Sequence, residues 1–174
     1  MACSLINSIP FACRDSVGGI KQIKIASYPG LASITSDFTA SSGVVTIAGA
    51  SLDLPWFVYY VEKETASFTD TANNNIQNGT SFMSSELKFI FNKLSATIRN
   101  EFNVLRQTSV ILAFRDMNDS YWIMGYETGA DMTAGSLMTG TARGDRSGAD
   151  ITFTSKDANP VFSISAATYN SLGS

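Results

Sequence analysis

The residues that could do chemistry are acidic, and they occur in close pairs. Two carboxyl groups can together supply acid–base or glycosidase chemistry. Each pair here is equally well explained by a solvated strand edge or a turn, and none belongs to a longer catalytic motif. We therefore expect no enzymatic activity. The pairs are Glu62 with Glu64, Asp116 with Asp119, and Asp145 with Asp150.

Groups for nucleophilic, metal or nucleotide chemistry are scarce. The sequence contains no histidine, which excludes Ser-His-Asp and Cys-His sites and the commonest metal ligand. Its two cysteines, Cys3 and Cys13, lie near the N-terminus and are expected to be free thiols. The 116–120 turn lacks the ligand spacing of an EF-hand loop, and no glycine-rich phosphate-binding motif occurs. No metal or cofactor is predicted.

Composition indicates one globular domain with an unusually uncharged surface. The chain has 174 residues, and 44% of them are hydrophobic but only 16% charged. Such a surface suits contacts between protein subunits, because few charges lose water on association. The net charge is −3 and no basic stripe is present, so tight DNA binding is not expected. No signal peptide or membrane-spanning run is recognised, and the chain is expected to be made in the cytosol.

Hydrophobic patterning predicts a mainly β protein, an antiparallel sandwich or barrel with one flanking α-helix. Alternation of apolar and polar residues predicts strands, the first of which places Lys24 on a solvated face. The long segment 56–68 begins with an apolar run that indicates burial on both faces. The glycine-rich region after Gly125 is interpreted as turns, and the tail 165–174 as loosely held. The predicted strands are residues 20–27, 44–48, 56–68, 80–91, 109–115, 121–126, 149–154 and 161–164.

A single amphipathic helix is predicted at about residues 95–107. Ser95 is a suitable N-cap, and apolar residues recur at helical spacing from Leu94 to Leu105. A helix of this length is marginal alone in water, so we expect its apolar stripe to pack on the sheet.

Two segments are predicted to contact other subunits. Residues 1–18 are interpreted as an N-terminal arm preceding a single domain at 19–174, and residues 69–79 as a long loop. Long loops without a structure of their own are often functional. The candidate interface residues in these segments are Ile9, Phe11, Thr71, Asn74, Asn75, Ile76, Gln77 and Asn78.

Exposed aromatic residues offer an alternative from another functional class. Tyr59, Tyr60, Tyr121 and Trp122 could together form a sugar-binding platform, as in a carbohydrate-binding or adhesin domain. Aromatic residues on strands more often form core or cross-strand pairs.

The order of elements from Trp56 onward resembles the tail tube proteins of long-tailed bacteriophages and related contractile machines. The similar segments are WFVYYVEKETASFTDT, the loop NNNIQNGT, the strand SELKFIFNKL, the helix SATIRNEFNVL and the hairpin VILAFRDMNDSYWIMGY. The segment GADMTAGSLMTGTARGDRSGADITFTS also resembles strand endings of phage virion proteins.

This resemblance implies a structural virion protein without catalysis. Members of the family form rings, commonly of six subunits, that stack into a tube through which the genome is ejected. The expected partners are further copies of this chain and other virion tail or neck proteins, with DNA as passing cargo and no membrane. The expected location is the virion tail, after synthesis in the host bacterial cytoplasm. Connector-ring, tail-terminator and capsid-decoration roles remain open.

Overall fold

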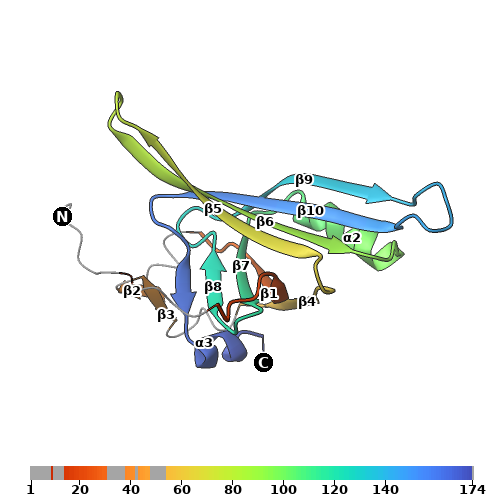
Figure 1. Cartoon of the computed structure of the whole chain (residues 1–174), viewed down its shortest axis with the longest axis horizontal. Coiled ribbons are helices and arrows are strands. Elements are labelled where there is room, and N and C mark those ends of the chain that lie inside the picture. Colours follow the sequence, from red (N-terminus) through yellow and green to blue (C-terminus); the bar gives the residue numbers. More distant parts are fainter. Residues whose placement is uncertain (1–8, 10–13, 31–37, 42, 48–53, 174) are drawn as a thin grey trace.

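The computed structural model describes residues 9, 14–30, 38–41, 43–47 and 54–173 (Figure 1). Half of the chain is strand and 11% is helical, which confirms a mainly β fold. The described residues include one helix of seven or more residues. The strands form two sheets that face each other as a sandwich.

Sheet A contains seven strands in the order β2-β3-β11-β8-β7-β1-β4, all antiparallel except the β3–β11 pair. The predicted strands 20–27, 44–48, 109–115, 121–126 and 161–164 all lie in this sheet, within a few residues of their expected bounds. The observed strands of sheet A are β1 (Ile20–Ser27), β2 (Phe38–Ser41), β3 (Val44–Ile47), β4 (Phe57–Tyr60), β7 (Val110–Asp116), β8 (Tyr121–Met124) and β11 (Phe162–Ile164).

Sheet B contains four strands in the order β5-β6-β10-β9, and every neighbouring pair is antiparallel. Its hairpins β5–β6 and β9–β10 extend away from the body in opposite directions (Figure 1). The bounds are β5 (Ala66–Asn75), β6 (Thr80–Phe91), β9 (Asp131–Met138) and β10 (Gly148–Asp157).

The main core fills the space between the two sheets. Alternate residues of β6 and β10, such as Leu87, Phe89 and Phe153, are fully buried against sheet A. β7 crosses beneath sheet B from one edge to the other. It begins at a bridge between Val110 and Ala130, next to β9, and ends beneath β5, where the rings of Phe68 and Phe114 lie 4.8 Å apart.

The helix α2 (Ala96–Leu105) closes the side of the sandwich beneath β9. The Ser95 hydroxyl accepts a hydrogen bond from the Ile98 amide at 3.2 Å, which confirms the N-cap. A Cβ added at Gly135 of β9 would lie 2.8 Å from the Phe102 ring, so this ring packs directly on the β9 backbone. Only Leu105 of the helix is buried, so the apolar stripe is partly exposed rather than all core.

The C-terminal tail corrects two predictions. Residues 166–171 form a further helix, α3 (Ala166–Ser171), rather than a loose tail, and Tyr169 and Leu172 are buried against the outer face of sheet A. Lys24 is therefore buried rather than solvated. Its ammonium group donates to the carbonyls of Tyr169 and Leu172 at 2.8 and 2.5 Å.

The prediction of a single strand at 56–68 is wrong, because the chain passes from sheet A to sheet B within this segment. β4 pairs with β1 in sheet A, whereas β5 pairs with β6 in sheet B, and a turn at 61–65 separates them. The apolar run does not mark burial on both faces, because β4 is an edge strand on which Tyr60 is 76% exposed.

Candidate assembly surfaces

The predicted loop 69–79 is mostly strand, which corrects its secondary structure. β5 continues to Asn75 and β6 starts at Thr80, so only residues 76–79 form the turn. Gly79 has φ of +64°, a conformation that glycine adopts without strain. Residues 73–82 are called the arm below and are distinct from the predicted N-terminal arm at 1–18. They extend beyond Met83, where the pairing between β6 and β10 ends.

The arm is a two-stranded ribbon held by its own polar side chains. The Ser81 hydroxyl donates to the Asn74 side chain at 2.6 Å, and the Asn78 amide donates to the Asn75 side chain at 3.1 Å. Ile76 at its tip is 95% exposed. An isolated two-stranded hairpin is marginally stable in water, so such an arm benefits from a partner.

The arm brings together most of the candidate interface residues. Six of them lie on it or on the adjoining strand, and all six are solvent-exposed. Ile9 is also exposed, at 96%, and Phe11 lies outside the described residues. The six are Thr71, Asn74, Asn75, Ile76, Gln77 and Asn78.

Both edges of sheet B are open and carry few charges. In the described part of the chain, β5 and β9 each pair with another strand on one side only. Residues 71–85 and 132–142 contain no Lys, Arg, Asp or Glu. The Asp70 carboxylate is engaged internally, accepting from the Ser85 hydroxyl and the Val161 amide. Soluble proteins commonly protect open edges with charges, and these edges lack that protection.

β9 is an open edge of sheet B in the described part of the chain, and it was not predicted from the sequence. The glycines around it were interpreted as turn signals, but Gly135 lies inside the strand, where it makes room for Phe102. The run from Met132 to Met138 without a charge, between two turn regions, is the signal that could have identified an edge strand.

The outer face of sheet B is polar and contains charges of both signs. Hydroxyl groups dominate it, and those of Thr133 and Thr154 lie 2.8 Å apart. Lys88 and Glu86 project on this face from β6, opposite Thr152 and Thr154 of β10. The face therefore offers neither an apolar binding surface nor a cationic one.

The paired carboxylates are parts of turns. The Asp116 carboxylate accepts from the amides of Asn118 and Ser120 at 2.9 and 2.8 Å and from the Trp122 indole at 3.2 Å. Asp119 pairs with Lys21 and Arg115. Hydrogen bonds from these two cations lower the pKa of the Asp119 carboxyl.

The remaining pairs are also structural. Glu62 accepts a hydrogen bond from the Asn92 side chain, and Glu64 lies with it in the turn at 61–65. Hydrogen bonds from the backbone amides of Ala142 and Thr141 lower the pKa of Asp145, which organises the turn before β10. The Asp150 carboxylate pairs with Arg146. No group of three metal-ligating side chains occurs among the described residues.

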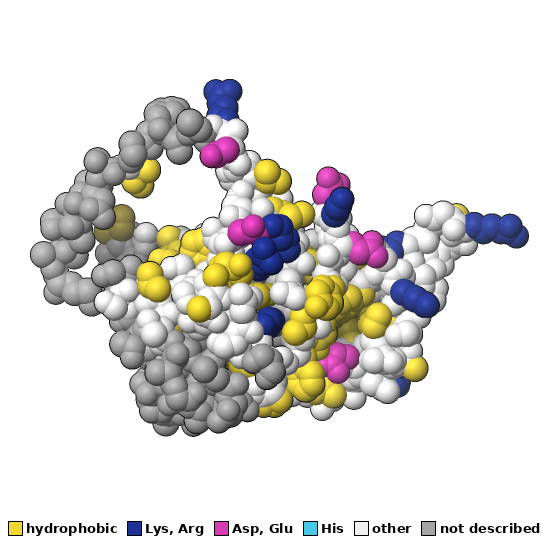
Figure 2. Space-filling model, turned by 90° about the horizontal axis from the view of Figure 1, so that it is seen from below, with side chains coloured by type: hydrophobic (Ala, Val, Ile, Leu, Met, Phe, Trp, Pro, Cys, Tyr) yellow, Lys and Arg dark blue, Asp and Glu magenta, His cyan; other side chains and the backbone are white. Residues whose placement is uncertain are grey.

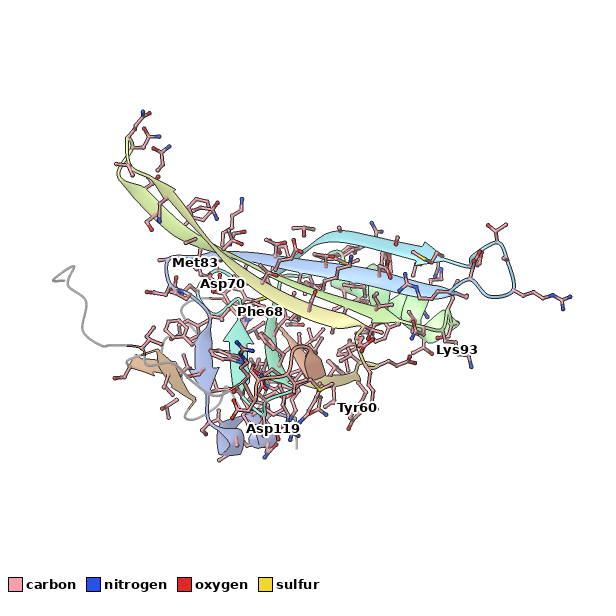
Figure 3. The ribbon with its side chains drawn as sticks, viewed as in Figure 1. Tyr60, Phe68, Asp70, Met83, Lys93 and Asp119 are labelled. Carbon is pink, nitrogen blue, oxygen red and sulfur yellow. The ribbon has the colours of Figure 1, made fainter. Side chains whose placement is uncertain are left out.

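The four aromatic residues considered for sugar binding do not form one platform. Tyr59 donates to Glu101 of α2, while Tyr121 packs on Tyr169 with ring centroids 4.9 Å apart. Trp122 is half-buried and turns its indole toward Asp116. Tyr60 alone is largely exposed, on β4 (Figure 3). Seen from below, its strand belongs to a face with scattered hydrophobic side chains (Figure 2).

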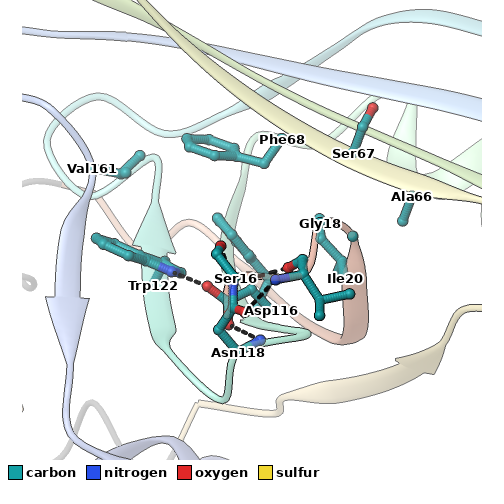
Figure 4. A pocket seen from close by; sticks show the side chains of 13 residues that line it. Ser16, Gly18, Ile20, Ala66, Ser67, Phe68, Asp116, Asn118, Trp122 and Val161 are labelled. Atoms are coloured by element: carbon teal, nitrogen blue, oxygen red, sulfur yellow. Dashed lines mark hydrogen bonds between the residues drawn. The ribbon is translucent and has the colours of Figure 1, made fainter. Parts of the chain in front are cut away.

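A pocket of about 400 Å³ opens beneath β5. Phe68 lies above it, Trp122 and Val161 to one side, and the segment 16–20 at its mouth (Figure 4). The Val17 amide donates to the Asn118 side chain at 2.7 Å, which fixes this mouth. The lining is mostly apolar, and its one charged residue, Asp116, is satisfied by the hydrogen bonds described above.

Comparisons with known protein families, with curated proteins and with solved structures find no match for this chain. In the described part of the chain, no helix is both long and apolar enough to cross a membrane.

Proposed function

We propose that this protein is a structural subunit that assembles into rings through the two edges of sheet B, and that the rings stack into a tube of the phage-tail type. The observation that carries the proposal is the even, fully antiparallel four-stranded sheet with two open, nearly uncharged edges. No catalytic role is proposed.

The strand directions favour a closed ring. Because sheet B has an even number of alternating strands, β9 of one copy and β5 of the next run antiparallel when copies repeat in the same orientation. The two edges also have comparable lengths, at eight and ten residues. Such a head-to-tail interface generates a ring when its rotation closes. Sheet B would then continue from copy to copy as the wall of the ring.

The surface chemistry supports a conduit lined by sheet B. Its outer face holds hydroxyl groups and charges of both signs, so it would not retain a polyanion such as DNA. The arm extends beyond the sheet, where it can reach a neighbouring ring. Virion tail location and passage of the genome form part of this proposal, and head–tail connector, terminator and decoration roles are variants of it.

The edge pairing is tested by charges placed at the junction. Ser67 and Ala134 are exposed, and the strand registers place them in one row across the outer face, through Lys88 and Thr152. A variant with Ser67→Lys and Ala134→Lys sets like charges against each other at each junction, whereas Ser67→Glu with Ala134→Lys sets opposite charges there.

We expect the Lys/Lys variant to form rings only at higher concentration than the Glu/Lys variant, measured by sedimentation velocity and electron microscopy at low salt. Both should unfold within about 0.5 kcal/mol of the wild type, because the sites are exposed. Equal assembly of the two variants would contradict pairing at these edges.

A further inference from the structure

We propose that the pocket beneath β5 receives helix α2 of the adjacent copy. This inference rests on the proposed ring, and it names a second contact across the same junction. Its occupant is a second copy of this chain.

The two surfaces lie at opposite edges of one sheet and on the same face. α2 packs on the core-facing side of β9 through Phe102 and Gly135, and the pocket lies on the core-facing side of β5 at Ala66 and Phe68. When β9 of one copy pairs with β5 of the next, the strands are about 4.8 Å apart. The helix beneath one strand then lies beside the pocket beneath the other.

The strand registers place both features at the same height along the sheet. Gly135 pairs with Ile151, Ile151 with Phe89, and Phe89 with Ala66, so a single row crosses all four strands. The row begins at Gly135, on which Phe102 packs. It ends at Ala66, which lines the pocket. If β9 of one copy and β5 of the next pair along this same row, α2 therefore lies opposite the pocket.

Each surface is incompletely covered in the single copy. A groove beside α2 is lined by Leu94, Ala96, Arg99 and Leu137, and Leu137 is 39% exposed. The pocket presents Phe68, Trp122 and Val161. Burying apolar side chains of one copy against the other removes both surfaces from water, which favours association.

The charges at the two surfaces are compatible with this contact. Arg99 lies on the exposed side of α2. Asp15 lines a neighbouring pocket that shares Ser16 and Val17 with the pocket beneath β5. Inside the pocket, Asp116 already accepts three hydrogen bonds, so no unsatisfied carboxylate meets the helix. The contact would place Arg99 on the side of the pocket next to Asp15 and leave no buried charge without a partner.

Cross-linking between two different copies tests the inference. In full-length protein with Cys3→Ser and Cys13→Ser, one preparation carries Arg99→Cys and another Ser16→Cys, both at exposed positions. The two are mixed under conditions in which electron microscopy detects rings, and a short bis-maleimide is added. The control mixture replaces Arg99→Cys with Gly144→Cys, in the β9–β10 turn, where an added Cβ meets open space.

We expect the Arg99→Cys and Ser16→Cys mixture to give at least tenfold more hetero-cross-linked dimer than the control mixture. Rings without this excess would overturn the α2 contact while leaving edge pairing intact. Absence of rings at every concentration would overturn both the contact and the proposed assembly. A cross-link that forms in dilute protein without rings would also contradict the inference, because the contact depends on the junction.

Discussion

Lys24 connects the C-terminal helix to sheet A through a buried charge. Its ammonium group lies 4.7 Å from the centre of the Tyr169 ring and donates to two carbonyls at the end of α3. A cation at a helix C-terminus complements the partial negative charge of the last carbonyls. Burial lowers the pKa of this lysine, and the hydrogen bonds compensate for part of the cost of burying it.

We predict that Lys24→Met lowers the free energy of unfolding by about 1–3 kcal/mol, because the two carbonyls lose their donor while the apolar stem is retained. Urea unfolding measures the loss, and hydrogen exchange should show weaker protection at 166–172. Lys88→Met, on the outer face of sheet B, is the matched control and should change stability little. Equal effects of the two substitutions would contradict the role of Lys24.

Asp157 makes stability depend on pH in a defined direction. The residue is 7% exposed, and burial raises the pKa of its carboxyl despite hydrogen bonds from Thr128. The nearby charge of Glu127 raises it further. The pKa of the Asp157 carboxyl is higher in the folded than in the unfolded protein. The stability that this group contributes is therefore fully present below about pH 3.8, and it is lost as pH rises through the folded-state pKa.

Asp157→Asn keeps the acceptor oxygen but cannot ionise. We predict that its stability relative to the wild type increases as pH rises from about 3.8 through the folded pKa of Asp157 and then levels off. Chemical unfolding across this range measures the difference. If the stability difference between Asp157→Asn and the wild type were constant with pH, burial would not shift the pKa of this carboxyl.

Gly135 determines how closely α2 approaches sheet B. A Cβ there would lie 2.1 Å from the Met132 methyl carbon and 2.8 Å from the Phe102 ring. We predict that Gly135→Ala destabilises the fold by about 1–3 kcal/mol, because the ring and the helix must shift. Gly144→Ala, where an added Cβ meets open space, is the control, and thermal unfolding compares the two.

The elements that follow local patterns were predictable. β1 and β6 have the predicted bounds because their apolar residues alternate, and the hydroxyl of Ser95 caps α2 as expected. The division between β4 and β5 was not predictable from the usual turn residues. Glu64 adopts φ of +62° there, and neither glycine nor proline marks the turn.

The surfaces proposed for assembly depend on contacts distant in sequence. Exposure of the arm could be predicted from its turn-forming residues, although its strand pairing could not. The pocket unites the segment 16–20 with Phe68, Trp122 and Val161, which no local pattern relates. Burial of Lys24 likewise depends on α3, which lies far along the chain.

The two sheets have different environments. Sheet A is buried on both faces of its central strands, by sheet B on one side and by α3 on the other. Sheet B has one polar outer face and two open edges. In a ring, this difference would assign sheet B to the wall of the lumen and sheet A to the exterior.

Electron microscopy of the purified chain over a range of concentrations is the sharpest test of assembly through sheet B. We predict closed rings with a hollow centre, with stacked tubes as concentration increases. A monodisperse monomer at every concentration would contradict assembly through sheet B. A monomer that also bound glycans would instead support the carbohydrate-binding alternative.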